Sequence, residues 1–313
     1  MTVTEAAPKP PAPVRRTGDV VFSGLARAAG ITILVALAGV AVFLTIEGFP
    51  AVTAPASAMG GKSGIVLYVW PLLFGTLLAA LLAMIIATPL AIGVALVISH
   101  FAPRKLSRTL GYLIDLLAAV PSVVYGLWGI NFLAPRMVGL YEWLEENLGF
   151  LPFFTGPASS TGRTILTASL VLAVMALPII TAITREIFAQ TPVLHQEAAL
   201  ALGATRWEMI RMTVFPYGRS GMVSATMLGL GRALGETMAV AMVLSATGVI
   251  SFNLISSTNP STIAANIALQ FGEASGLKVN VLIFSGLVLF VVTFIVNFLG
   301  RAIAGRGYKG ESR

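Results

Sequence analysis

The stretch from Trp70 to Ile98 reads WPLLFGTLLAALLAMIIATPLAIGVALVI and contains no charged residue. A helix of about 20 mostly apolar residues crosses the hydrocarbon core of a bilayer, and this stretch is longer than that. Within hydrocarbon every backbone N–H and C=O needs a partner, and a single crossing segment satisfies this need only as a helix. The stretch therefore predicts a membrane-spanning helix.

Similar apolar runs recur along the chain, whose 313 residues are 57% hydrophobic and only 11% charged. Soluble domains carry about a quarter charged residues, so this composition excludes a water-soluble core. The sequence predicts an all-α polytopic membrane protein with six transmembrane helices. The other five helices are expected near residues 26–46, 111–134, 164–183, 221–247 and 281–300.

The two ends of the chain differ from the apolar middle. Residues 1–16 are rich in Pro and Ala and low in bulky apolar residues, so they cannot offset the entropy lost on ordering. We expect a flexible tail at 1–24, a transmembrane domain at 25–305 and a C-terminal tail at 306–313. The transmembrane domain includes a long cytoplasmic loop at 184–220.

The distribution of basic residues predicts the orientation. Of the 20 Lys and Arg residues, fifteen lie at the two ends of the chain and in the second and fourth connections, against four in the other three connections. Cytoplasmic segments carry this excess, so both termini are expected in the cytoplasm. The basic residues form short clusters and no basic face, so the net charge of +7 indicates membrane topology and lipid contact, with no nucleic-acid partner.

The composition also argues against chemistry of the chain's own. With no cysteine, the sequence offers no disulfide framework, thiolate metal site or cysteine nucleophile. His100 and His195 are the only histidines, and two isolated imidazoles do not make a metal site. We therefore expect neither a metal nor a cofactor in this chain.

Proline residues fall inside three of the expected spans. Pro89, Pro121 and Pro178 each remove a helical hydrogen bond, which predicts a kink at each position. Kinked spans suit a bundle that opens, but proline is also common in membrane helices generally, and both interpretations stay open.

The long cytoplasmic loop predicts two short helices. Thr191 can act as N-cap before Pro192, Gly203 supplies a stop, and Thr205 with Glu208 has the spacing of a capping box. Pro216 is expected to end the second helix before the next span begins. Apolar residues on these helices need covering, either by a soluble partner or by the membrane and the chain's own helices.

The loop then shows a longer pattern. Glu197-Ala198-Ala199 is followed after three residues by Gly203 and after nine more by Thr213-Val-Phe-Pro216. This resembles the loop signature of ABC-importer permeases, from which it departs at Thr213 and Phe215. The resemblance implies the type I ABC-importer permease fold. It also implies that this loop couples to a separate ATPase through Glu197, Ala198, Ala199, Gly203 and Pro216.

The fifth expected span carries two charges within Gly229-Leu-Gly-Arg232-Ala-Leu-Gly-Glu236-Thr237. Charges in the membrane are costly and mark functional sites by default. Four residues apart on a helix, Arg232 and Glu236 share a face and can pair. Arg suits a tetrahedral oxyanion, so these residues and Thr237 are candidates for an anion pathway, whereas a structural ion pair is the alternative.

This stretch and the loop together resemble the PstC family of phosphate permeases, over the whole chain length. The resemblance implies a non-catalytic permease subunit in a bacterial inner membrane, working with a second permease of the PstA type, an ATPase dimer of the PstB type and an external phosphate-binding protein of the PstS type. ATP and magnesium would bind to the ATPase. Sulfate or molybdate as cargo, and an ion-coupled secondary transporter, remain alternatives. The Ala-rich and Gly-rich composition and the Pro-rich tail suggest an actinobacterial source.

Two further features are expected to be structural. Asp115 lies near the cytoplasmic end of its span, where Arg104, Lys105 and Arg108 are the nearest basic residues in sequence. The segment 140–148 can form a short helix with an aromatic and aliphatic face at the outer surface, as an interfacial anchor or as a docking site for an external partner.

Overall fold

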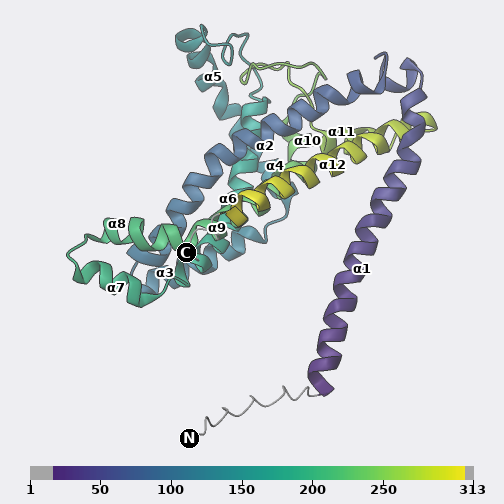
Figure 1. The fold of residues 1–313 in the computed structure, drawn as a ribbon. Helices are drawn as coiled ribbons and strands as arrows, with labels where there is room; N and C mark the ends of the chain where they lie inside the picture. Colours follow the sequence, from purple (N-terminus) through teal and green to yellow (C-terminus); the bar gives the residue numbers. More distant parts are fainter. Residues whose placement is uncertain (1–16, 307–313) are drawn as a thin grey trace, which may run out of the picture.

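The computed structural model of the protein describes residues 17–306. This part of the chain is almost entirely helical (Figure 1), and within it the extended pairing is limited to one isolated bridge between Ala246 and Asn259. The first helix, α1, spans Thr17–Gly48, so residues 17–24, which the sequence assigned to the tail, are helical. Residues 1–16 and 307–313 lie outside the described residues.

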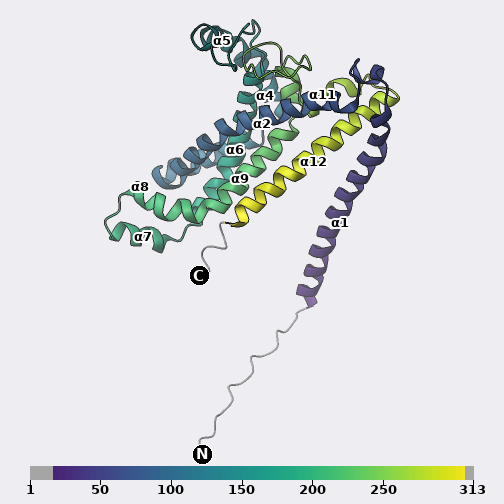
Figure 2. The same cartoon turned by 45° about the horizontal axis from the view of Figure 1, so that its top comes forward.

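Helix α1 runs apart from the other helices for most of its length (Figures 1 and 2). It meets α12 (Leu277–Arg306) at its C-terminal end, where a Cβ built on Gly48 would lie 3.2 Å from Phe284 Cα. None of the most apolar part of α1 is buried by the rest of the chain. In a bilayer such a surface is stable against lipid, since lipid tails are as apolar as the side chains.

The centre of the bundle is formed by α2 (Ile65–Leu96), α6 (Ile165–Ala189) and α9 (Phe215–Gly235). Ala79, Ala83, Ala87 and Ala91 recur every four residues along α2 and are fully or almost fully buried. Small side chains on one face allow close approach of the backbones, which is the usual way that membrane helices pack. Both α2 and α6 stay helical through the prolines inside them.

The third expected span is interrupted. Helix α3 covers Arg104–Ala118, and α4 (Ser122–Trp128) begins directly after Pro121. The Tyr125 hydroxyl donates a hydrogen bond to the Leu117 carbonyl across the break, at 2.9 Å. The expected kink at Pro121 is therefore a break between two helices, and the tyrosine satisfies one carbonyl that the break leaves without a helical partner.

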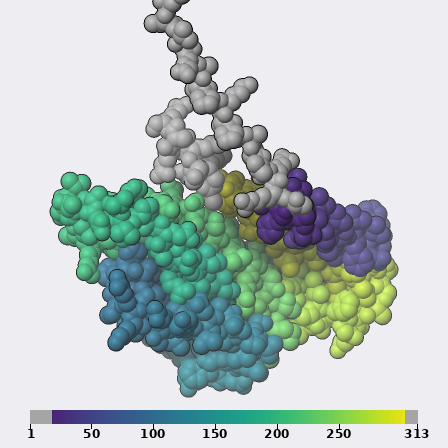
Figure 3. All heavy atoms as spheres, turned by 90° about the horizontal axis from the view of Figure 1, so that it is seen from below, coloured from purple at the N-terminus to yellow at the C-terminus, as the bar shows by residue number. Residues whose placement is uncertain are grey.

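Beyond α4 the helix continues through the π-helical turn Gly129–Leu133 into α5 (Ala134–Leu148). The expected outer helix at 140–148 is thus the end of a longer one. The loop between α6 and α9 holds α7 (Val193–Ala201) and α8 (Arg206–Met209), and Figure 3 shows this pair projecting at the edge of the face seen from below.

The fifth expected span is also interrupted, between α9 and α10 (Met238–Val243), and an irregular segment then leads to α11 (Ile263–Phe271). In the described residues five helical stretches are long and apolar enough to cross a membrane, and α9 is not among them. Because α9 lies beside α6 and α12 (Figure 2), the arrangement is compatible with six crossings. The five stretches are Gly18–Thr53, Ile65–Phe101, Ser122–Leu148, Ile165–Ala189 and Leu277–Ala302.

Candidate functional site

The junction between α9 and α10 interrupts a helix of the bundle at Glu236 and Thr237. Helix α9 ends at Gly235, and Glu236 is extended, with φ −67° and ψ 127°. Thr237 follows, and its hydroxyl donates to the Gly235 carbonyl at 3.1 Å. Broken helices at membrane depth occur where the freed backbone is buried in protein or lines a cavity, so this junction is a candidate site.

The predicted pairing of Arg232 with Glu236 is wrong. It required one continuous helix, whereas α9 ends at Gly235, between the two residues, and Glu236 is extended. No ion pair joins them in residues 17–306. Arg232 is partly buried, and its Nε atom is buried without a hydrogen-bond partner in the described part of the chain.

Glu236 has a different role in the backbone. Its side chain is 9% exposed, and its Oε1 atom accepts a hydrogen bond from the Ala239 N–H at 3.1 Å. The carboxylate thereby satisfies one of the unpaired N–H groups at the start of α10. Burial of the side chain and this bond hold the carboxylate at the break.

Helix α10 is positioned by close packing against α4. A Cβ on Gly126 would lie 3.0 Å from Ala239 Cα and 2.8 Å from Met242 Sδ. The absence of a side chain at Gly126 therefore lets α10 approach α4 closely, and Ala239, Val240 and Val243 are buried there. The break thus lies within a packed part of the bundle.

Two residues that the sequence did not single out fix the outer side of this region. The Asn259 amide donates to the carbonyls of Arg163, Ser245 and Ser256, at 3.0 to 3.3 Å, and its Oδ1 accepts from the Ile165 N–H at 3.1 Å. The Arg163 guanidinium donates to the Met242 carbonyl at 3.1 Å, near the end of α10. Nothing in the sequence marks a single asparagine in a loop as a residue that bonds several backbone groups.

The loop between α6 and α9 has the predicted caps. Gly203 has φ +87°, and the N–H groups of Gly203 and Ala204 donate to the carbonyls of Leu200 and Ala199, at 3.0 and 3.2 Å. This is a Schellman motif, which ends α7. The capping box is also confirmed, with Glu208 N–H donating to Thr205 Oγ1 at 3.3 Å and Thr205 N–H donating to Glu208 Oε2 at 2.8 Å. Hydrogen bonds from the Thr205 amide and hydroxyl lower the pKa of Glu208.

Two details of the predicted loop are wrong. Pro192, not Thr191, is the N-cap of α7, and the Thr191 hydroxyl is buried without a partner in the described residues. Pro216 does not end the second helix, because the chain passes from α8 through the π-helical turn Ile210–Val214 into α9, with Pro216 in its first turn. The wider turn accommodates a residue that has no N–H to donate.

The chain's own helices cover some of the loop's apolar residues, and partner docking on the others stays a prediction. Ala199, Met209 and Ile210 are buried against Ala95 of α2 and Phe188 of α6. Other residues of the same loop remain open, and Leu202 is 90% exposed. The exposed residues that carry the family signature or flank it are Glu197, Ala198, Leu200, Leu202, Gly203 and Trp207.

Asp115 has a structural role, but not with the basic residues expected from the sequence. Its carboxylate forms an ion pair with Arg185 of α6, at 3.4 Å. Gly111 makes room for this contact, since a Cβ there would coincide with the Arg185 guanidinium. The pair therefore ties α3 to α6.

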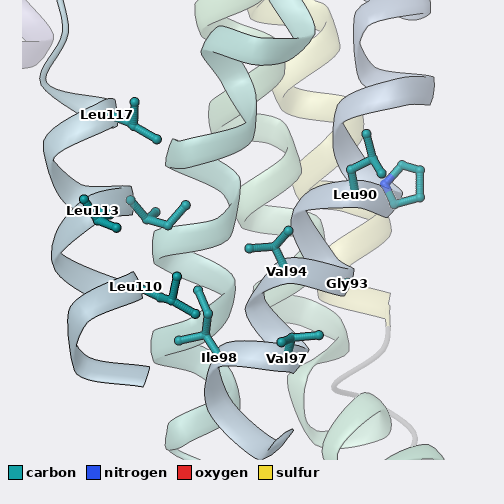
Figure 4. Close-up of a pocket in the computed structure, with 10 residues that line it drawn as sticks. Leu90, Gly93, Val94, Val97, Ile98, Leu110, Leu113 and Leu117 are labelled. Atoms are coloured by element: carbon teal, nitrogen blue, oxygen red, sulfur yellow. The ribbon is translucent and has the colours of Figure 1, made fainter. Parts of the chain in front are cut away.

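Two hollows of similar size open on the bundle, and their linings differ. The first, of about 510 Å³, lies between α2 and α3 and is lined only by Pro, Gly and aliphatic side chains (Figure 4). It offers no group that could recognise an anion. The second, of about 570 Å³, lies between α6, α9 and α12 and includes Arg232.

Comparison with known proteins identifies the family. A family model described as "Binding-protein-dependent transport system inner membrane component" matches residues 87–306. The "Phosphate transport system permease protein PstC 2" of Mycobacterium tuberculosis is 46% identical over 310 residues, which cover 95% of each chain. The PstC of Mesorhizobium japonicum is 37% identical over 305 residues, covering 90% of this chain and 89% of its own. This chain belongs to the PstC permease family.

Solved structures support the fold of this PstC-family permease. A bacterial ABC transporter involved in the import of the acidic polysaccharide alginate is 17% identical, with a TM-score of 0.61 over 92% of this chain and 96% of the other. A structure of the MetNI methionine ABC transporter gives a TM-score of 0.52 at 18% identity, over 76% of this chain and 94% of the other. The all-α ABC-permease fold is confirmed, and the protein is a multi-pass inner-membrane protein. The mycobacterial relative agrees with the actinobacterial character of the sequence.

Proposed function

We propose that this chain is the permease subunit of an ATP-driven importer that moves inorganic phosphate into the cytoplasm. The observation that carries the proposal is Arg232, a guanidinium that lines a groove of the bundle and whose Nε is buried without a partner among residues 17–306. An Arg in such a position is costly unless an anion uses it. The relatives, named as phosphate transport permeases, indicate which anion.

The pathway residues in this proposal are Arg232, Glu236 and Thr237. Arg232 attracts the anion by charge and by its planar fork of donors. Glu236 keeps negative charge beside the route, so that the anion is not bound too tightly to leave. Thr237 lies at the break itself and adds a hydroxyl.

The remaining parts of the transporter are also proposed. A second permease of the PstA type completes the route, a PstB-type ATPase dimer holds ATP and magnesium, and a PstS-type protein delivers phosphate from outside. The ATPase contacts the loop at Glu197, Ala198, Ala199 and Gly203, and Pro216 begins the helix that carries the motion into the membrane. This chain is non-catalytic, and both its termini lie in the cytoplasm.

Uptake of radioactive phosphate by cells tests the proposal. Arg232→Ala is expected to abolish uptake while the complex still assembles, because the variant removes the charge and leaves the apolar packing. Arg108→Ala, on the exposed cytoplasmic end of α3, is the matched control and should import normally. Normal phosphate uptake by Arg232→Ala would overturn the assignment, and inhibition of uptake by sulfate or molybdate would move it to another oxyanion.

A further inference from the structure

The groove of about 570 Å³ between α6, α9 and α12 has polar residues from two helices in its lining. Ser224 and Arg232 come from α9, and Asn297 and Arg301 come from α12. In Figure 2, α9 runs beside both α6 and α12, the helices whose residues line the groove with those of α9. The sequence did not single out Ser224 or Asn297, and it counted Arg301 only as a cytoplasmic charge.

The charges in this groove are unbalanced. Its lining includes two arginines and no carboxylate. Like charges that share a partly buried site repel each other, and a bound anion removes that repulsion. Arg232 Nε is buried without a hydrogen bond, and the ion pair found in residues 17–306 lies elsewhere, between α3 and α6.

The donors match one kind of anion. Two guanidinium groups provide planar forks, and the Asn297 amide adds further donors, whereas the Ser224 hydroxyl donates to the Ser220 carbonyl at 3.0 Å. Several donors from two helices around one groove suit a tetrahedral group with several oxygens. The geometry points to a phosphate-group site formed by Arg232, Asn297 and Arg301. This inference rests on the proposed function, since Arg232 belongs to both sites.

A phosphate group could reach the groove from two sources. Inorganic phosphate would occupy it on its way from the break at Glu236 to the cytoplasm. Alternatively, the headgroup of an anionic phospholipid would enter from the membrane, since Arg301 is exposed near the cytoplasmic end of α12. Both sources present the same chemistry to the arginines.

Gly231 provides a way to fill the groove without disturbing the fold. It lines the groove, and a Cβ there would meet nothing within 4 Å. Gly231→Leu therefore places a side chain in the open space, and it also favours the helix, because Gly is a poor helix former. This variant blocks the site by volume, whereas Arg301→Gln removes a charge.

The test uses the full chain with its membrane partners, purified without the external binding protein. In dodecyl maltoside, which has no phosphate, equilibrium dialysis measures binding of radioactive inorganic phosphate. In nanodiscs of mixed phosphatidylglycerol and phosphatidylcholine, native mass spectrometry measures retained phosphatidylglycerol. Arg108→Gln, which removes a charge outside the groove, is the control.

We expect Arg301→Gln and Gly231→Leu to weaken one of these two signals by about tenfold, the effect of losing a charge-assisted hydrogen bond. Loss of phosphate binding identifies the occupant of the groove as the transported anion. Loss of retained phosphatidylglycerol identifies the occupant as a lipid headgroup. If both signals stay within about twofold of wild type, there is no phosphate-group site here. If the Arg301→Gln variant does not accumulate in the membrane, binding by Gly231→Leu alone decides whether the groove holds a phosphate group.

This outcome is separate from that of the proposed function. Unchanged binding in Arg301→Gln and Gly231→Leu refutes the phosphate-group site in the groove. The uptake defect expected for Arg232→Ala would still support the proposed pathway. Normal uptake by Arg232→Ala refutes the pathway, and the binding and retention measurements on Arg301→Gln and Gly231→Leu still show whether the groove binds a phosphate group.

Discussion

Glu236 has a backbone role in the structure and, in our proposal, a transport role as well. Its carboxylate accepts from the Ala239 N–H at the start of α10 and contributes the negative charge at the break. Removing the side chain leaves a buried N–H unsatisfied, at a cost of about 1 to 3 kcal/mol, and removes the charge as well. The two roles can be separated by substitution.

Glu236→Ala is expected to abolish phosphate uptake, because α10 loses its anchor and the route loses its charge. Glu236→Gln keeps an acceptor oxygen for Ala239 and should retain measurable uptake. The measurement is initial uptake of radioactive phosphate, normalised to assembled transporter in the membrane. Equal uptake by the two variants would contradict the capping role.

At the residue scale, the sequence was sufficient to locate the candidate site but not its contacts. Arg232 and Glu236 stand out because ionisable residues are rare in membrane segments. Their pairing failed because spacing arguments assume an unbroken helix. Similarly, Asp115 contacts Arg185 across the bundle, and the sequence favoured basic residues of its own helix end. Tertiary contacts of this kind leave no local pattern.

Among the structural elements, the cytoplasmic loop was the most predictable. Its capping box and its Schellman glycine depend on residues within a few positions of each other, so the sequence contains the whole cause. The path through Pro216 was not predictable in the same way. A proline can end a helix, kink it or lie in its first turn, and here Pro216 lies in the first turn of α9, directly after the π-helical turn Ile210–Val214.

Two adjacent alanines of the loop, Ala198 and Ala199, differ in their exposure. Ala199 is buried against the chain's own helices, whereas Ala198 is exposed on α7 and available to a partner. We expect Ala198→Trp to reduce co-purification of the ATPase about tenfold and to lower uptake to match, because a bulky side chain prevents close approach at a cost of about 1 to 3 kcal/mol.

Thr109→Trp is the control for this prediction, since Thr109 is exposed on α3 and lies outside the loop. The amount of ATPase retained on the tagged permease in mild detergent, determined by quantitative mass spectrometry, checks the result. Full retention by Ala198→Trp would mean that the ATPase does not contact this face of α7.

At the scale of the whole molecule, hydropathy predicted four of the six expected spans closely, but not where the other two helices break. The breaks after Ala118 and Gly235 both fall within expected spans, near 111–134 and 221–247. Hydropathy measures composition, whereas a break can persist where nearby side chains bond the freed backbone groups, as Tyr125 and Glu236 do here. Five stretches of the described residues are confirmed as long and apolar enough to cross, and the sixth crossing stays a prediction.

The orientation of the whole chain is a prediction from the excess of basic residues on one side, and α6 allows a direct test of it. Ser160 and Gln190 are exposed just beyond the opposite ends of this helix. The wild-type chain has no cysteine, so it provides a background without label. In intact spheroplasts, a membrane-impermeant maleimide should label Ser160→Cys. Gln190→Cys should be labelled only after permeabilisation. The reverse result would place the α7–α8 loop outside the cell, where no ATPase could reach it.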